Sequence, residues 1–270
     1  MIIDGKKIAA EIIEELKKRP KPKKFFGAFL VGDNLELISF LKQKEKVAKE
    51  IGIDFRIYRL TKSIDQDELR KEVLKIAQHK TCGGVIVQLP PPERINAQYV
   101  LNAIPREKDV DVLGERALGA FYAGRNPVLP PAVGVVDKII QNLKFKIQNS
   151  TVAVIGLGFL VGEPIATWLQ GKCLEIYLLD EGSDFSILKQ ADLVITGVGK
   201  PGLIEPSMLK DGAGVIDFGY GIRDGKICGD FNTELPITSY QLLRFYTETP
   251  GGTGPILVAK LFENFYKLNE

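Results

Sequence analysis

The chain has 270 residues, of which 45% are hydrophobic and 26% are charged, as is usual for a globular protein of one large or two medium domains. The net charge of +2 gives no support for nucleic acid or an anionic membrane as the main partner. No apolar run approaches the roughly eighteen residues of a membrane span, and the amino terminus lacks the apolar core of a signal peptide.

The cysteine and histidine content limits the available chemistry. Cys82, Cys173 and Cys228 stand far apart without a Cys-x-x-Cys pair, which predicts free, buried thiols and a cytoplasmic location. The single histidine, His79, lies in a polar run and is predicted to be on the surface. Because this only histidine is predicted at the surface, it argues against a histidine-based triad, and no metal site is predicted.

Hydrophobic periodicity divides the chain into two blocks of alternating helices and strands. In the first block, helices are predicted over residues 6–19, 35–51, 66–79 and 97–103, and strands over 25–31, 54–60 and 84–89. A proline-bracketed linker at 125–131 leads into a helix at 133–142. In the second block, strands are predicted from residue 151 and over 175–179, 193–197 and 214–218, and helices over 164–169, 185–189 and 256–268. The alternation predicts an α/β protein with two domains and parallel sheets.

The segment from Thr151 to Gly162 has the layout of a dinucleotide-binding βαβ unit. An apolar strand runs into a glycine turn and a helix start, where backbone can approach a pyrophosphate closely. Asp180 closes the next strand about twenty residues on, where a carboxylate accepts hydrogen bonds from a ribose and repels the extra phosphate of NADP. The residues predicted to hold the cofactor are Gly156, Leu157, Gly158, Val161, Gly162, Asp180 and Gly197.

The glycine spacing leaves an alternative open. Gly-x-Gly-x-x-x-Gly is one residue longer than the usual fingerprint, and glycine-rich turns between a strand and a helix also occur without a nucleotide. The motif therefore indicates a nicotinamide enzyme, with NAD favoured over NADP.

Candidate site residues in the first block each have a structural interpretation as well. Phe40 and Lys44 share a helix face. The ring could stack on a flat heterocycle while the amine handles a proton, or Phe40 could be a core residue and Lys44 part of a solvated basic face. Gln88 ends an apolar strand, as a binding residue or a capping amide. Asp109 and Asp111 alternate along an extended segment, so both carboxylates would lie on one side of it. They could be a pair of metal ligands, or one of them could accept two hydrogen bonds from the edge of a ring.

Several segments together resemble one family. They are Ile3–Lys6, Val31–Asp33, Lys44, Gly83–Pro90, Lys108–Asp111, Val161–Pro164, Ala191–Ile195, Val215–Gly219, Gly229-Asp230 and Pro250–Pro255. Their order along the whole chain resembles the bifunctional methylenetetrahydrofolate dehydrogenase/methenyltetrahydrofolate cyclohydrolase family.

The resemblance implies a fold and a set of roles. It implies a first domain over residues 1–124, a Rossmann NAD(P)-binding domain over 125–249, a last helix at 250–270 packed on the first domain, a folate cleft between the domains, and a homodimer. Lys44 matches the family's catalytic lysine, Gln88 its partner glutamine, and Asp111 the acid that holds the pterin. Phe40 and the loop of Pro250, Gly251 and Gly252 match substrate-binding positions.

Departures from the family pattern bear on activity and cofactor choice. The usual tyrosine before the lysine is Phe40, which keeps ring stacking and loses a hydroxyl, and the usual glycine after Asp111 is Val112. Further changes lie at Leu35–Leu37 and Leu129–Ala132. Two other changes, at Gly156–Gly158 and Leu179–Gly182, remove groups that would hold a ribose phosphate, so NAD is favoured.

The resemblance predicts oxidation of methylenetetrahydrofolate and hydrolysis of the methenyl product, with a small-molecule folate as the partner. Three alternatives stay open: a dehydrogenase without the hydrolase activity, a non-catalytic folate- or nucleotide-binding relative, and a different Rossmann oxidoreductase.

Overall fold

The structure is a computed structural model that describes all residues from 1 to 270, and it divides into two compact units. The first, here the three-stranded unit, contains residues 10–131 and 258–270. The second, here the six-stranded unit, contains residues 1–9 and 132–257. Helices α1 (Gly5–Lys18) and α8 (Thr253–Lys267) begin in the six-stranded unit and end in the three-stranded unit.

The sheet of the three-stranded unit is parallel, in the order β3-β2-β4. Its strands are β2 (Phe25–Val31), β3 (Phe55–Leu60) and β4 (Cys82–Val87). Every residue of β2 and of β4 is buried. Their unbroken apolar runs match this burial, because a parallel strand covered on both faces has no polar side.

Side-chain alternation along β2 assigns a helix to each face of this sheet. Phe26 stacks on Phe265 of α8, with ring centroids 4.8 Å apart. The next residue, Gly27, faces the opposite way, and a Cβ there would lie 3.3 Å from Ile76 of α3 (Gln66–Gln78). Helices α3 and α8 therefore cover opposite faces.

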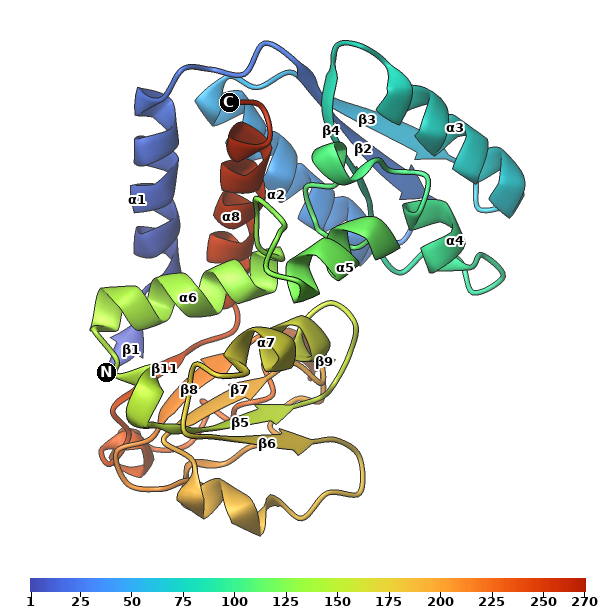
Figure 1. Cartoon of the computed structure of the whole chain (residues 1–270). Coiled ribbons are helices and arrows are strands. Elements are labelled where there is room, and N and C mark those ends of the chain that lie inside the picture. Colours follow the sequence, from blue (N-terminus) through green and yellow to red (C-terminus); the bar gives the residue numbers. More distant parts are fainter. The chain divides into compact units, whose positions relative to one another are not determined.

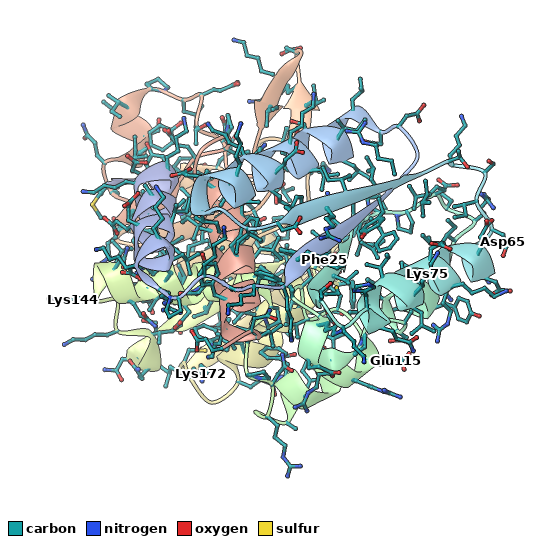
Figure 2. All side chains as sticks on the ribbon, turned by 90° about the horizontal axis from the view of Figure 1, so that it is seen from above. Phe25, Asp65, Lys75, Glu115, Lys144 and Lys172 are labelled. Atoms are coloured by element: carbon teal, nitrogen blue, oxygen red, sulfur yellow. The ribbon has the colours of Figure 1, made fainter.

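Side-chain caps fix where the helices of this unit begin. Asn34 accepts hydrogen bonds from Glu36 N and Leu37 N at the start of α2 (Leu35–Ile51). Asp65 caps α3 in the same way, and Figure 2 places it at the outer end of that helix. The unit also contains α4 (Ala97–Leu101) and α5 (Glu115–Tyr122).

The sheet of the six-stranded unit is parallel throughout, in the order β1-β11-β8-β7-β5-β6. Its strands are β1 (Ile2–Ile3), β5 (Thr151–Ile155), β6 (Glu175–Leu179), β7 (Leu193–Thr196), β8 (Gly214–Asp217) and β11 (Phe245–Thr247). After β5 the chain moves to β6 on one side and then to β7 on the other (Figure 1). Ligands of open α/β sheets bind at such a switch point, outside the carboxyl ends of the strands.

Helix α7 (Gly162–Leu169) packs on β5 and β6, and α6 (Pro131–Leu143) precedes β5 along the chain (Figure 1). A hairpin of β9 (Gly221–Arg223) and β10 (Lys226–Cys228) follows β8. None of the helices combines the length and the hydropathy that a membrane-spanning segment needs.

The predicted two-domain α/β architecture is confirmed, and some predictions of detail are wrong. The segment Phe185–Gln190 is a 3-10 helix, although a helix over 185–189 is predicted. Residues 1–9 group with the six-stranded unit in the structure, because β1 pairs with β11. The domain bounds of 1–124 and 125–249 stay a prediction. His79 is exposed, as predicted. All three cysteines are free, but only Cys82 is buried, and Cys173 and Cys228 are half-buried.

Candidate active site

Lys44 and Gln88 meet within the three-stranded unit. Lys44 Nζ donates a hydrogen bond of 2.5 Å to Gln88 Oε1. Lys44 lies on α2, one turn after the half-buried Phe40, and Gln88 directly follows β4. Gln88 is only 5% exposed, and its own N–H bonds Phe29 O of β2, so the amide is held by the sheet. The amine is therefore fixed at the carboxyl end of the sheet.

The charge of Asp111 acts on the pKa of the Lys44 amine. Burial lowers the pKa of Lys44 below its usual value of 10.5, and the Asp111 carboxylate acts in the opposite direction. Burial likewise raises the pKa of Asp111, and Lys44 opposes that shift. Burial thus favours the neutral form of each group. An amine that loses its proton more easily than a free lysine is suited to accept a proton from water.

Asp109 and Asp111 have different environments despite their alternation in sequence. Asp109 is 1% exposed, and its Oδ2 accepts hydrogen bonds from Leu113 N and Gly114 N at 3.0 and 2.7 Å. This carboxyl therefore ties down the backbone that follows Asp111. Val112, which directly follows Asp111, has a φ of 59°, a conformation that favours the glycine usual in the resembling family.

Asn264 of α8 holds the same segment from the other side. Its Nδ2 donates to Val110 O at 3.0 Å and to Leu129 O at 2.8 Å, and the residue is 6% exposed. The backbone on both sides of Asp111 is therefore fixed by buried polar side chains. Asn264 is not predicted from the sequence, because an asparagine within an apolar helix has no spacing pattern that marks it.

Burial raises the pKa of Asp109 to about 7, with the Asp111 charge contributing, whereas the unfolded carboxyl titrates near 3.8. The folded state then binds more protons between these values, so the stability that Asp109 contributes is lost as pH rises from about 4 to 7. We expect Asp109→Asn, which keeps an oxygen for both N–H groups, to reduce this fall by up to about 1.4 kcal/mol per pH unit. Urea unfolding of the wild type and of Asp109→Asn at pH 4 to 8 measures this pH dependence of stability. Identical pH profiles of the two proteins would contradict the contribution assigned to Asp109.

In the six-stranded unit, the turn after β5 brings backbone segments into close contact. Gly156 has a φ of 81°, and a Cβ on Gly162 would lie 1.9 Å from Gly156 O. Gly158 is exposed, and a Cβ on it would meet no atom within 4 Å, so its surface is open. The turn therefore matches the open, side-chain-free backbone that a pyrophosphate requires.

Asp180 lies beside this turn. Gly156 N donates to Leu179 O at 2.9 Å, which joins the turn to the end of β6 immediately before the exposed Asp180. Asp180 Oδ1 accepts from Glu181 N at 2.9 Å and keeps its other oxygen for a hydroxyl. The residues from 180 to 184 include Asp180, Glu181 and Asp184 and no lysine or arginine. This stretch therefore carries negative charge and no cationic side chain.

Gly197 faces the turn from the end of β7. A Cβ on Gly197 would lie 2.8 Å from Cγ1 of the half-buried Val161, and one on Gly156 would lie 2.8 Å from Val198 Cγ2. The half-buried Leu157 and the exposed Gly158 follow on the β5 side. The predicted cofactor residues thus line the switch point between β5 and β7, and they fit a dinucleotide there.

The loop of Pro250, Gly251 and Gly252 also belongs to the six-stranded unit. Gly251 has a φ of 108°, and Gly252 N donates to Glu248 O at 2.8 Å. A Cβ on Gly5 would lie 1.7 Å from Gly252 O, so the loop lies directly against the start of α1. The predicted site residues therefore form two groups, one in each unit, and their meeting in a folate cleft stays a prediction.

Comparisons with known proteins extend along both units. Residues 3–111 match the catalytic domain of the tetrahydrofolate dehydrogenase/cyclohydrolase family, and residues 130–270 match its NAD(P)-binding domain. The bifunctional protein FolD of Halothermothrix orenii is 34% identical over 280 residues, which cover 98% of this chain and 96% of that protein. The FolD protein of Helicobacter pylori is 31% identical over 279 residues, which cover 98% and 93%.

Solved structures agree with these matches. The bifunctional FolD dehydrogenase/cyclohydrolase of Campylobacter jejuni has a TM-score of 0.94 at 30% identity, over 100% of this chain and 98% of that one. The Trypanosoma brucei FolD, solved with NADP and an inhibitor, has a TM-score of 0.92 at 25% identity, over 99% and 96%. Because both family domains match and relatives above 30% identity span nearly the whole chain, the protein belongs to the tetrahydrofolate dehydrogenase/cyclohydrolase family of enzymes.

Proposed function

We propose that the protein oxidises 5,10-methylenetetrahydrofolate to the methenyl form with NAD and hydrolyses the methenyl form to 10-formyltetrahydrofolate. The observation that carries the proposal is the hydrogen bond between Lys44 Nζ and Gln88 Oε1, under the influence of the Asp111 charge. The FolD relatives are described as bifunctional, which supports both activities. The homodimer implied by the resemblance stays a prediction.

For the oxidation, the task of the side chains is to bind and orient. Bound NAD supplies the hydride acceptor. Gly156, Gly158 and the start of α7 would hold its pyrophosphate, and Asp180 its ribose hydroxyls. On the folate side, the Asp111 carboxylate would accept two N–H donors of the pterin edge, and the Phe40 ring would stack on the pterin. The folate nitrogens stabilise the cation that forms, so no side-chain base is needed.

For the hydrolysis, a proton must move twice. Water attacks the methenyl carbon while a neutral Lys44 amine takes its first proton. The hydroxyl that forms then releases its own proton to solvent as the carbonyl forms and the bond from that carbon to one ring nitrogen breaks, and this nitrogen takes the first proton back from Lys44. Gln88 Oε1 holds the amine during this exchange. Phe40 brings no hydroxyl to the exchange, so Lys44 is the proposed proton carrier.

One assay series tests the proposal. Methylenetetrahydrofolate is mixed with NAD or with NADP and reduction is followed by absorbance, while methenyl hydrolysis is followed separately without nucleotide. We expect faster reduction of NAD and measurable hydrolysis. Equal or faster reduction of NADP would overturn the cofactor proposal. Reduction without hydrolysis would favour the second candidate, a monofunctional dehydrogenase, which the missing hydroxyl at Phe40 suggests.

A variant pair tests the ribose site directly. Leu157→Arg with Asp180→Ser places a cation in the turn and removes a carboxylate beside it, so the preference should move towards NADP by about tenfold or more. Glu175→Ser is the matched control, because Glu175 is an exposed acid at the opposite end of β6. An unchanged preference in the double variant would mean that the ribose binds elsewhere.

A further inference from the structure

Asp230 is a fully buried carboxylate, with an exposed fraction of 0%, and three donors surround it. Its Oδ2 accepts from Thr196 Oγ1 at 2.7 Å and from Val198 N at 2.7 Å. Its Oδ1 accepts from Lys200 N at 2.7 Å. A buried anion is tolerated only when it is this well hydrogen-bonded, so both oxygens are committed to the loop after β7.

The bonded loop is exposed on its outer side. Val198 is 44% exposed, while its N–H points inward to Asp230. Gly199, with a φ of 80°, reverses the chain so that the N–H groups on both sides of it reach one carboxylate. Together with the hydrogen bond from Gly197 N to Ile155 O at 3.0 Å, the carboxylate therefore anchors this loop to the sheet.

This loop forms one side of the switch point described above. The Val198 side chain lies against Gly156, and Gly197 lies against Val161. Any displacement of residues 197–200 therefore changes the space beside the glycine turn, where the dinucleotide is proposed to bind.

Asp230 is itself held firmly in place. A Cβ on Gly219 would lie 2.3 Å from Asp230 Cγ, so only glycine at 219 leaves room for the carboxyl. Asp230 O accepts from Ile204 N at 2.9 Å, within a run of backbone bonds that join residues 202–204 to 229–232. The neighbouring Asp217 carboxyl accepts from Gly219 N and Phe231 N, at 2.6 and 3.0 Å, on the two sides of this contact.

We propose that Asp230 is a positioning residue, which fixes the loop of residues 197–200 against the glycine turn and thereby sets the affinity for the nicotinamide dinucleotide. The inference rests on the proposed function for the identity of the ligand. It adds a residue of the protein interior, outside the glycine turn and the acid after β6, to those that determine cofactor binding.

Asp230→Asn tests the proposal because an amide has only one acceptor oxygen. With this oxygen at the Oδ2 position, the bonds to Thr196 and Val198 persist and the amide nitrogen opposes Lys200 N–H. We expect hydrogen exchange at the Lys200 amide to accelerate more than at Val198. We also expect the Kd for NAD, measured by calorimetry, to rise about tenfold, the loss typical of a bond to a charged group. The KM for folate should stay unchanged.

Two further variants complete the experiment. Asp192→Asn is the matched control, because this carboxylate also accepts a backbone N–H, from Thr151 at the opposite end of β5. It should leave the Kd for NAD unchanged. Thr196→Val removes one of the three bonds without a change of shape, and should raise the Kd by about threefold. This milder variant decides the question if Asp230→Asn does not fold.

The outcomes separate the two proposals. A wild-type protein that binds neither NAD nor NADP overturns the proposed function. A wild-type protein that binds NAD, with an unchanged Kd in Asp230→Asn and Thr196→Val, overturns the positioning role. An equal rise of Kd in Asp192→Asn also overturns it, since the effect would then follow from general destabilisation.

Discussion

Lys44→Met is expected to lower the rate of methenyl hydrolysis by at least about 100-fold, while oxidation of methylenetetrahydrofolate persists. Hydrolysis needs a group that takes a proton from water, and the Lys44 amine, held by Gln88, is the group proposed for it. Oxidation needs only bound and oriented reactants. The two rates are measured separately, hydrolysis without nucleotide and oxidation with saturating NAD.

The pH dependence of hydrolysis gives an independent check on the same residue. Because burial lowers the pKa of Lys44, the wild-type rate should rise with pH as the amine loses its proton, with its midpoint below the usual 10.5. Lys46→Met on the exposed side of α2 is the matched control and should change neither rate. Hydrolysis at the wild-type rate in Lys44→Met would remove Lys44 from the mechanism.

Gly162→Ala is expected to have the largest effect on the six-stranded unit. The new Cβ would lie 1.9 Å from Gly156 O and 2.9 Å from Leu157 Cα. Both are backbone atoms, which cannot relieve the clash by a side-chain rotation. Helix α7 must then move away from β5. Overpacking of this kind should destabilise the protein by about 2 kcal/mol or more, which lowers Tm by roughly 5 °C.

Gly158→Ala separates the cofactor effect from the folding effect. No atom lies within 4 Å of the added methyl group, and the backbone there is not left-handed, so Tm should stay unchanged. The methyl group occupies the surface where the pyrophosphate approaches, so the Kd for NAD should rise. Thermal unfolding and calorimetry measure both quantities. Unchanged NAD binding in both variants would contradict the assignment of this turn.

The sequence predicts those parts of the fold whose pattern is long and local. Helix α2 has its predicted bounds because an apolar face repeats along it until Gly52, and β2 because its run of seven residues is uniformly apolar. Strands β1 and β11 are not predicted, because they have only two and three residues and form by pairing with partners distant in the sequence, β1 with β11 and β11 also with β8. Helix α5 is not predicted either, because eight residues around Gly119 form a helix only with tertiary support.

The candidate site divides in the same way. The spacing of the glycines predicts the turn after β5. Lys44 and Gln88 are predicted as site residues only through the resemblance to the family. Alternation alone treats Asp109 and Asp111 alike, and only burial and the bonds to Leu113 and Gly114 separate them. Asp230 carries no local signal, since its three donors come from residues at least 30 positions away in the chain.

The pairing of β1 with β11 has a consequence for biosynthesis. Ile2 aligns with Tyr246 and Ile3 with Thr247, so the two partners are separated by most of the polypeptide. During translation β1 therefore stays unpaired until β11, near the carboxyl terminus, has left the ribosome. The six-stranded unit therefore completes its sheet only after residues 10–131 of the three-stranded unit have been synthesised. A fragment that starts at the linker would leave an edge of β11 uncovered and open to intermolecular association.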